Sequence, residues 1–532
     1  MRRPPRSSRS ESHPPLRSRQ SLRLLLSLTL AVSSAAAVLT AAPASAGPEP
    51  TTGTGSTAVH RHLAPAVLAR ARAALAGTSA PSRDASLALR RLFVALPRLD
   101  AAHRRAAHEL LARPTNGARD PLGDGYAVPA RHACRGHVCI HWVTSTKDAP
   151  PNRRWVDRTL AYVDHVWRVE VGHLGYRAPL GDGRRGGDDR LDVYLKDVGS
   201  RGIYGYCAPE RRDPDHKWLA SGYCVLDDDF ARSQYGARPR ASLRVTAAHE
   251  FFHAVQFAYD YGEDQWLMEA SATWMEEQVA DDVDDNRQYL PFGQLGRPSH
   301  PLDTFAQQGF AQYGNWPFFQ FLSSRYGATV VRRIWAWAGE FRHGGHDYSL
   351  AAVKDALEPH GGFADVFRRY AAAMTVPRTA FAEGAGWPRP AAAAVRRLSA
   401  GSPTARRRLS LDHLTFRQVV ARPARDLKGR WRLRVVIDGP RARTAPAAYV
   451  VVRTAQGGVR QRPVTLDDTG AGRTTVAFRA GSTRDAHVVV VNGSTRYSCW
   501  HRTSWACQGR ARDDDEPFTV ALTAVRRRPR HR

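Results

Sequence analysis

The string His249-Glu250-Phe251-Phe252-His253 combines residue types and a spacing that can bind and use a metal ion. On a helix, residues four apart project from one side, so both imidazoles can reach a single ion while Glu250 lies beside them. Glu269 follows downstream in the run from Trp266 to Trp274. The sequence therefore predicts a Zn2+ site with His249, His253 and Glu269 as ligands.

The chemistry of such a site explains the spacing. A catalytic zinc ion keeps one position open beside three protein ligands, and water there becomes a nucleophile near neutral pH. Glu250 would accept the proton of this water and later deliver it to the leaving amine in amide hydrolysis. The pattern thus indicates a zinc metallopeptidase; the competing interpretation is a core helix with two incidental histidines.

The residues around the string predict the scaffold that a ligand pair needs. Apolar side chains at helical spacing indicate a buried helix from about 242 to 259. They are Leu243, Val245, Phe251, Phe252, Val255 and Phe257.

The start of the chain has the pattern of a secretory signal peptide over residues 1–46. A basic leader precedes an apolar run over 24–39, and Ala44-Ser45-Ala46 offers a small-residue cleavage site. No later segment approaches eighteen uninterrupted apolar residues, so no transmembrane segment is expected. The prediction is a secreted, extracellular protein.

Six cysteines agree with an oxidising location, because an even number in an exported protein is most simply a set of disulfides. Sequence proximity favours three local pairs over the other connectivities. These pairs are Cys134 with Cys139, Cys207 with Cys224, and Cys499 with Cys507. A structural metal held by Cys134, Cys139 and His132 or His137 is the alternative.

The formal net charge of +28 is carried mainly by arginine. The arginines are scattered along the sequence without an aromatic-interleaved basic stripe, so they mainly indicate a solvated surface and no specific nucleic acid partner. Electrostatic association with the acidic polymers of a cell envelope is the second interpretation. It leads to an alternative function, a non-catalytic envelope-binding protein that uses its basic surface and C-terminal domain.

The expected fold class is α+β, and composition divides the chain into stretches. Residues 47–83 are rich in Ala, Pro, Thr, Gly and Ser and predict a flexible linker. Residues 84–125 predict two helices broken near Pro97, either a removable pro-segment or a permanent brace. The remaining predictions are a catalytic domain over 126–395, an antiparallel β-sandwich over 408–525 and a basic tail over 526–532.

Local patterns predict individual elements of these domains. In the catalytic domain we expect a strand over 138–145, an amphipathic helix over 154–174 and a strand over 190–197 whose side chains alternate in polarity. An extended peptide substrate can pair with the edge of such a mixed sheet. The expected strands of the sandwich are 431–437, 448–452, 474–478, 487–491 and 518–524.

Two acidic runs could bind Ca2+ as a second cofactor. One covers Asp281 to Asn286 shortly after the Glu269 segment, and the other covers Asp513 to Glu516. Neither has the spacing of an EF-hand, and solvated surface loops are the simpler interpretation.

Several motifs together resemble known peptidases. The HExxH string with the downstream Glu269 run is similar to the gluzincin group of zinc metallopeptidases, the broad class of thermolysin and aminopeptidase N. A narrower resemblance, to a group of secreted metalloproteases, covers most of residues 85–525. It rests on the runs 139–142, 192–195, 204–207, 249–256 and 313–316.

The resemblance implies a zincin-like domain and roles for individual residues. His249, His253 and Glu269 would be the ligands and Glu250 the base, and Tyr313 would donate a hydrogen bond to the substrate carbonyl oxygen. The gap of fifteen residues between His253 and Glu269 is shorter than usual in that group. The alternative acidic ligands are therefore Glu276, or an aspartate at 260 or 264. Thr246, Ser271 and Thr273 are candidates for supporting the ligands.

Overall fold

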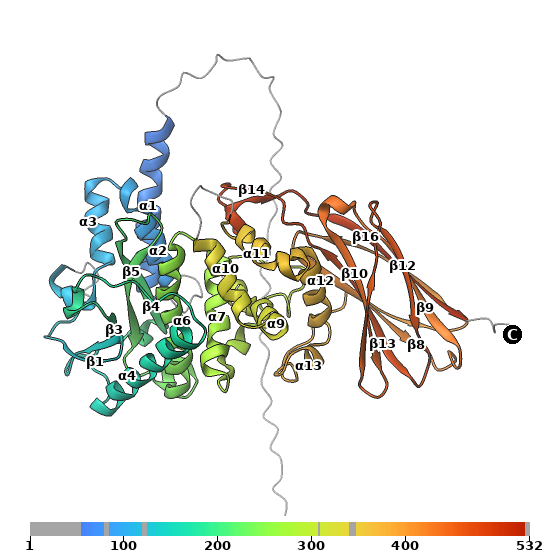
Figure 1. Cartoon of the computed structure of the whole chain (residues 1–532), viewed down its shortest axis with the longest axis horizontal. Helices are drawn as coiled ribbons and strands as arrows, with labels where there is room; N and C mark the ends of the chain where they lie inside the picture. Colours follow the sequence, from blue (N-terminus) through green and yellow to red (C-terminus); the bar gives the residue numbers. More distant parts are fainter. Residues whose placement is uncertain (1–54, 79–84, 120–124, 307–308, 340–346, 527–532) are drawn as a thin grey trace, which may run out of the picture. The chain divides into compact units, whose positions relative to one another are not determined.

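The structure, a computed structural model, describes residues 55–78, 85–119, 125–306, 309–339 and 347–526. The predicted signal peptide, the start of the predicted linker and the arginine tail after Arg526 lie outside the described residues. Among the helices that are described, none combines the length and the apolar character needed to cross a bilayer. Helices and several sheets occur together, so the fold class is α+β (Figure 1).

A mixed five-stranded sheet of order β1-β2-β3-β5-β4 lies at the centre of the N-terminal half. β3 pairs in parallel with β2 and β5, while β1 and β4 are antiparallel to their neighbours. β3, predicted over 190–197, is thus a central strand, and the edge strand nearest in sequence to the helix with the HExxH string is β4. The strands are β1 (Arg131–Arg135), β2 (Val138–Trp142), β3 (Leu191–Lys196), β4 (Gly205–Arg212) and β5 (Ala220–Asp227).

The alternating polarity of β3 does not give it a solvent-exposed face. Asp192 is buried, and it contacts the Arg113 guanidinium and His141 Nε2 (2.6 Å). Arg113 also contacts Asp182 and lies 2.6 Å from Glu210. A buried ion cluster therefore replaces water as the partner of the polar side chains.

This cluster bears on the two interpretations of residues 84–125. Arg113 follows helices α2 (Ser86–Ala95) and α3 (Ala101–Leu110), which are separated at Pro97 as the sequence predicts. Removing the segment would leave the buried Asp182 and Asp192 without the Arg113 guanidinium, and breaking a buried pair costs several kcal/mol in typical proteins, roughly 3 to 5. The physical argument favours the permanent brace.

Helix α1 (Gly55–Leu75) occupies most of the stretch for which the sequence predicted a flexible linker, so that prediction is wrong for these residues. Alanine and leucine favour a helix, and Leu68, Ala71 and Leu75 recur at helical spacing and are buried. Because this apolar stripe is buried, the segment is helical although its composition is typical of a linker.

Two long helices, α6 (Pro239–Asp260) and α7 (Gln265–Ala280), follow β5 and are joined by a short turn. α6 begins at Pro239, whose fixed φ suits the first helical position, and it is buried over nearly its whole length. The remaining helices are α4 (Arg153–Trp167), α5 (Arg232–Tyr235), α8 (Ala311–Gly314), α9 (Trp316–Tyr326), α10 (Thr329–Gly339), α11 (Leu350–Leu357), α12 (Gly362–Met374) and α13 (Pro377–Ala380).

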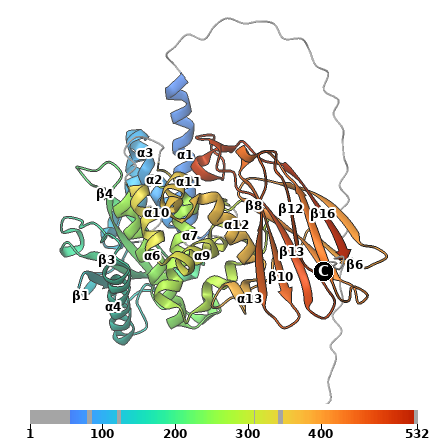
Figure 2. The same ribbon diagram turned by 45° about the vertical axis from the view of Figure 1, so that its right-hand side comes forward.

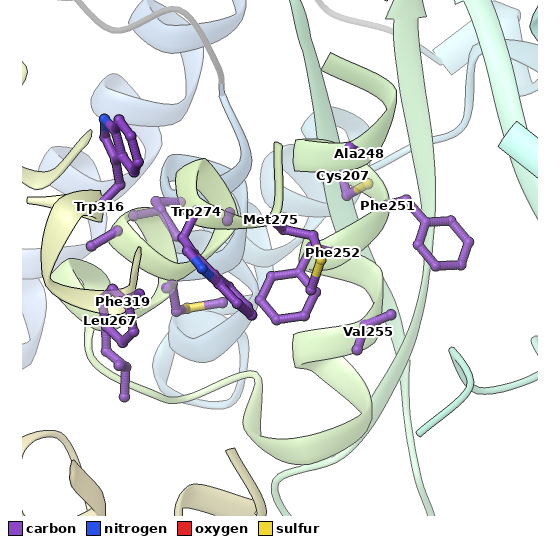
Figure 3. Close-up of a cluster of buried hydrophobic side chains, with 14 of the residues drawn as sticks. Cys207, Ala248, Phe251, Phe252, Val255, Leu267, Trp274, Met275, Trp316 and Phe319 are labelled. Atoms are coloured by element: carbon purple, nitrogen blue, oxygen red, sulfur yellow. The ribbon is translucent and has the colours of Figure 1, made fainter. Parts of the chain in front are cut away.

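Aromatic side chains pack α6 against α7 and against α4. Phe252 points toward Trp274 and Met275 of α7, whereas Phe251 and Val255 lie on the other side of α6 (Figure 3). Phe251 meets Trp167 of α4 edge to face with ring centroids 5.7 Å apart. The helix that carries the HExxH string is therefore fixed by packing on two sides, which a precise ligand geometry requires.

The helix predicted over 154–174 is formed in two parts. α4 continues as a π-helical turn over Arg168–His173, a conformation that often marks functional sites. This turn buries Glu170 completely, and neither of its carboxyl oxygens makes a hydrogen bond within the described residues. Burial raises the pKa of Glu170 well above its ordinary value, which disfavours its charged form.

The C-terminal part consists of two facing sheets, of order β11-β10-β13-β8-β6 and β12-β9-β16-β7 (Figures 1 and 2). Fully buried aliphatic residues such as Val435, Val488 and Val520 fill the space between the sheets. The strands are β6 (Ala394–Leu398), β7 (Thr404–Leu411), β8 (Thr415–Pro423), β9 (Trp431–Asp438), β10 (Pro446–Thr454), β11 (Val459–Val464), β12 (Ala471–Ala477), β13 (Thr483–Asn492) and β16 (Glu516–Arg526), with the short pair β14 (Tyr497–Ser498) and β15 (Arg510–Ala511).

Two details of the predicted sandwich need correction. It begins at β6, whose first two residues belong to the predicted catalytic domain and whose others precede the predicted start at residue 408, and it is not purely antiparallel, because β6 pairs with β8 in parallel. The chain crosses to the opposite sheet as β7 before returning as β8, which brings β6 and β8 side by side in the same direction. All five strands predicted by pattern are present.

The three disulfides expected from sequence proximity are formed: Cys134–Cys139, Cys207–Cys224 and Cys499–Cys507. The alternative of a metal held by the first pair is therefore wrong, because both thiols are used in the bridge. Disulfide bonding fits an extracellular protein.

A buried polar network joins the sandwich to the helices. His413, before β8, lies between Asp303 (Nε2 to Oδ1, 3.2 Å) and Asp514 (Nδ1 to Oδ1, 2.5 Å). The backbone N–H of Cys507 donates to Asp264, the residue that caps the start of α7. The acidic run Asp513 to Glu516 thus has partners within the protein, with Arg496 Nη1 lying 3.1 Å from Asp513.

The protein is expected to lose stability as pH rises from about 6.5 to 9, in part through His413. Burial alone would lower the pKa of His413, but the two aspartates raise it to about 9. A raised folded-state pKa stabilises the protein fully below the unfolded value near 6.5 and ceases to do so above 9, a change on the order of 3 kcal/mol at most. Thermal unfolding across this range should show the loss, and His413→Gln should flatten it; an unchanged slope in the variant would contradict the assignment.

Candidate metal centre

The two predicted histidines and the downstream glutamate converge between α6 and α7. Glu269 Oε2 lies 3.4 Å from His249 Nε2, and Glu269 Oε1 lies 3.7 Å from His253 Nε2. All three side chains are buried, and the potential ligand atoms lie within 4.8 Å of one another. Donor atoms about 2.0 to 2.1 Å from a tetrahedral zinc ion are roughly 3.3 Å apart, so both the spacing and the N, N, O donor set fit zinc.

Each histidine is oriented through its other ring nitrogen. His249 Nδ1 lies 2.9 Å from Glu276 Oε1, and His253 Nδ1 lies 2.7 Å from Gln256 Oε1. The Gln256 amide donates to the backbone oxygen of Met268 (2.9 Å), which directs its own oxygen at His253. Both Nδ1 atoms therefore act as donors, and both Nε2 atoms lie on the side of Glu269, the arrangement that metal-binding histidines have.

Glu276, the alternative third ligand, thus has a different place in the structure. It binds the side of the His249 ring that faces away from Glu269. The alternative aspartates lie in the turn between the helices: Asp264 accepts from the Gln265 and Cys507 N–H groups, and Asp260 accepts from Gly262. The geometry therefore favours Glu269 as the acidic partner of the histidine pair.

The electrostatics of the cluster favour a positive charge. Burial alone would lower the pKa of His249, but Glu269 and Glu276 raise it well above its ordinary value. Burial raises the pKa of Glu276 to about 7 against the opposing effect of His249. Two carboxylates beside the ring stabilise a cation at this position, whether a proton or a metal ion supplies the charge.

Glu250 points to a different set of neighbours from those of the ligands. Its Oε2 accepts a hydrogen bond from Ser86 Oγ (2.8 Å), and the same hydroxyl accepts from the backbone N–H of Cys207 on β4 (2.9 Å). Gly205 permits this close approach, since a Cβ there would lie 3.1 Å from Glu250 Cγ and 2.8 Å from the Val225 oxygen. The carboxylate is held between the start of α2 and the edge of the sheet.

The edge strand β4 is therefore partly covered. The sequence suggested that a substrate could pair with the edge of the mixed sheet, but at Cys207 the N–H is taken by Ser86, and Arg212 Nη2 donates to the backbone oxygen of Phe93 on α2 (3.1 Å). The Cys207 N–H is therefore not available to an extended peptide while α2 is in place, whereas the Arg212 contact uses only its side chain.

A pocket lies beside His249, with about 360 Å3 of empty space that includes the part open to solvent. Tyr313 of α8 lines it, with its ring centroid 6.0 Å from that of His249, and it stacks on Tyr289 at 5.1 Å. The lining residues are Tyr204, Val245, Thr246, His249, Glu250, Glu276, Asp285, Tyr289 and Tyr313.

The other candidate supporting residues fall into different places. Ser271 Oγ accepts from Gln256 Nε2 (3.3 Å) and so supports the His253 contact, while Thr273 bonds only the backbone of its own helix. In the acidic run after α7, the carboxylate of Asp281 lies in a cluster with those of Glu277 and Glu383. Asp282 forms an ion pair with Arg244 at 2.5 Å. Clusters of this kind are common without a cation.

The turn between α6 and α7 is stabilised by α2, a contact with no sequence signal. Arg90 Nη1 donates hydrogen bonds to the backbone oxygens of Tyr261 (3.0 Å) and Glu263 (2.7 Å). Through Ser86 and Arg90, α2 therefore contacts both the Glu250 carboxylate and the turn between α6 and α7. The sequence analysis missed this role because both residues lie more than 160 positions before their partners.

For the zinc peptidase that the sequence predicts, Ser86→Ala is expected to lower kcat about tenfold or more while leaving KM and metal content nearly unchanged, because the Glu250 carboxylate loses a donor that fixes its direction. Steady-state kinetics and metal analysis of the purified variant measure both effects. Ser221→Ala is a matched control, since that buried hydroxyl on β5 makes no hydrogen bond within the described residues. An equal loss in both variants would show a packing effect instead.

No protein-family model matches the sequence, and no curated protein matches it. Among solved structures, one similarity is to a family GH115 4-O-methyl-alpha-glucuronidase with specificity for decorated arabinogalactans, at 10% identity and a TM-score of 0.13. The aligned region covers 66% of this chain, which spans about half (54%) of that protein. A similarity this weak supports neither a fold nor a function.

Proposed function

We propose that the chain is a secreted zinc metallopeptidase of the gluzincin type, with a zincin-like catalytic domain that includes the sheet, α6 and α7. The observation that carries the proposal is the convergence of two imidazole nitrogens and one carboxylate, beside a separate carboxylate in a pocket. A core helix with incidental histidines does not require a downstream glutamate at 3.4 Å from one ring and 3.7 Å from the other.

Each side chain has a task in amide hydrolysis. His249, His253 and Glu269 would hold a zinc ion, which supplies Lewis acidity and activates water when bound. Glu250 accepts the proton of the attacking water and returns it to the leaving amine, and Ser86 keeps its carboxylate in position. Tyr313 lines the same pocket, where its phenol can donate a hydrogen bond to the carbonyl oxygen as negative charge grows.

Metal analysis of the purified protein, combined with hydrolysis of a mixed peptide library, tests the proposal. We expect about one zinc ion per chain, loss of hydrolysis with a chelator and recovery on addition of zinc. Protein that binds zinc but cleaves no peptide would remove the peptidase assignment and leave a metal-binding protein.

The alternative, a non-catalytic envelope-binding protein, makes a different prediction. Its retention on cell-wall material would weaken with salt and would not change in His249→Ala. Binding of this kind does not require Glu250 or the orienting contacts of the two histidines, so it does not account for the metal centre.

A further inference from the structure

Arginines that are scattered in the sequence gather on one surface of the C-terminal sandwich. The sheet β12-β9-β16-β7 turns alternate residues inward, as the burial of Leu433, Val435 and Ile437 on β9 shows. The residues between them point outward. We call the outward side the arginine face, after the five arginines that it carries: Arg406, Arg408, Arg432, Arg434 and Arg473.

The register of the strands places these side chains on a common surface. Arg434 of β9 lies opposite Thr523 of β16 and Thr475 of β12. Arg406 of β7 lies opposite Ala521 of β16. The strand β16 thus contributes short side chains between two rows of arginines. Four of the five arginines are exposed, whereas Arg432 is half-buried and its Nη2 donates to the backbone oxygen of Thr475 (3.1 Å).

The positive charge of the arginine face is not neutralised within the described part of the protein. None of its five arginines forms an ion pair there, in contrast with Arg113 and Arg453, which contact buried carboxylates. Asp438, at the end of β9, is the acid among the outward residues of these four strands. A flat surface with five arginines and one acid attracts anions.

The arrangement has a regular spacing. Arginines two residues apart on β7 and on β9 are roughly 7 Å from each other along the strand, and the two strands are about 10 Å apart across β16. A linear polymer with repeated negative charges can contact several of them at once, whereas a single small anion contacts one or two. Arginine favours phosphate, because its planar group binds two phosphate oxygens together.

We propose that the arginine face binds a linear anionic polymer of phosphate-linked units. Base stacking needs aromatic side chains, and the outward positions of the four strands contain none, which separates this surface from single-stranded nucleic acid sites. The proposal does not depend on the peptidase function, since the arginine face belongs to the sandwich and uses none of the metal ligands.

Binding of the full chain to long-chain inorganic polyphosphate tests the proposal, measured by fluorescence anisotropy at several salt concentrations. The triple variant Arg406→Gln, Arg434→Gln and Arg473→Gln should weaken binding at least about tenfold and lower the salt slope by about three, one for each lost contact. The matched control replaces three exposed arginines of other elements, Arg98, Arg105 and Arg154, with glutamine and removes the same charge. It should change affinity less than about twofold.

Two outcomes would overturn the proposal. Equal weakening in both triple variants would show that net charge, and not this surface, is responsible. Tighter binding of single-stranded DNA than of polyphosphate of equal charge would identify a nucleic acid partner instead. If the triple variant does not fold, the single variant Arg434→Glu decides, with an expected loss of about threefold or more. Peptide hydrolysis should be unchanged in these variants, so failure here leaves the proposed function intact.

Discussion

Glu250→Gln is expected to reduce peptide hydrolysis by about 10² to 10⁴-fold while the protein keeps its fold and its metal. Glutamine has nearly the same size and can still accept the hydrogen bond of Ser86, which lies 2.8 Å from Glu250 Oε2. It cannot accept a proton from water at neutral pH. The change therefore removes the base and leaves its surroundings in place, and kcat with metal content measured on the same sample shows both effects.

Glu277→Gln is the matched control for this substitution. Glu277 is a buried glutamate of the neighbouring helix α7 that accepts from Asn286 Nδ2 (2.6 Å) and does not line the pocket. Its replacement should leave kcat within about threefold of the original value. Full turnover in Glu250→Gln, with zinc bound, would show that another group is the base.

Local sequence patterns were sufficient for the elements that carry the ligands. The apolar residues around the HExxH string predict a helix over about 242–259, and α6 spans Pro239–Asp260. The period of the helix then places His249 and His253 on one side. The position of Glu269 opposite both rings depends on the packing of α6 against α7, which a pattern within one helix does not contain.

Contacts between distant segments were beyond a local pattern. Ser86 reaches Glu250 across 164 residues, and a serine at the start of a helix is normally explained as a cap. Asp192 occupies a polar position of an alternating strand, yet it is buried because Arg113, from a segment 79 residues earlier, neutralises it. In both cases the partner that determines the role lies in another element.

The charged surface of the sandwich likewise cannot be predicted from patterns within single strands. Alternating strands such as 431–437 are recognisable because apolar residues recur at every second position. The arginine face was not recognisable, because its arginines lie on β7, β9 and β12, which come together only in the folded sheet, with β16 between β7 and β9. The arginines are scattered along the sequence, whereas the pairing of β7, β9 and β12 with their neighbours places them on one face of the sheet.

Glu269→Ala is expected to abolish stable zinc binding, because the two imidazoles alone leave the ion with an incomplete set of protein ligands. The stabilisation that zinc gives the original protein should disappear with it. That stabilisation is about 2.7 kcal/mol when free zinc exceeds its dissociation constant a hundredfold, so the midpoint of thermal unfolding with and without zinc reports the loss without an activity assay.

Glu276→Gln distinguishes a ligand from a residue that orients one. Its Oε1 lies 2.9 Å from His249 Nδ1, on the side of the ring that faces away from Glu269. The variant should still bind zinc, about 10 to 100-fold more weakly, because a neutral amide oxygen is a weaker acceptor for the His249 ring than the carboxylate that it replaces. In Glu269→Ala, zinc should not shift the midpoint of thermal unfolding at any concentration. In Glu276→Gln, the shift should return when the zinc concentration is raised. The reverse order would make Glu276 the third ligand and would require His249 to turn its ring between the two carboxylates.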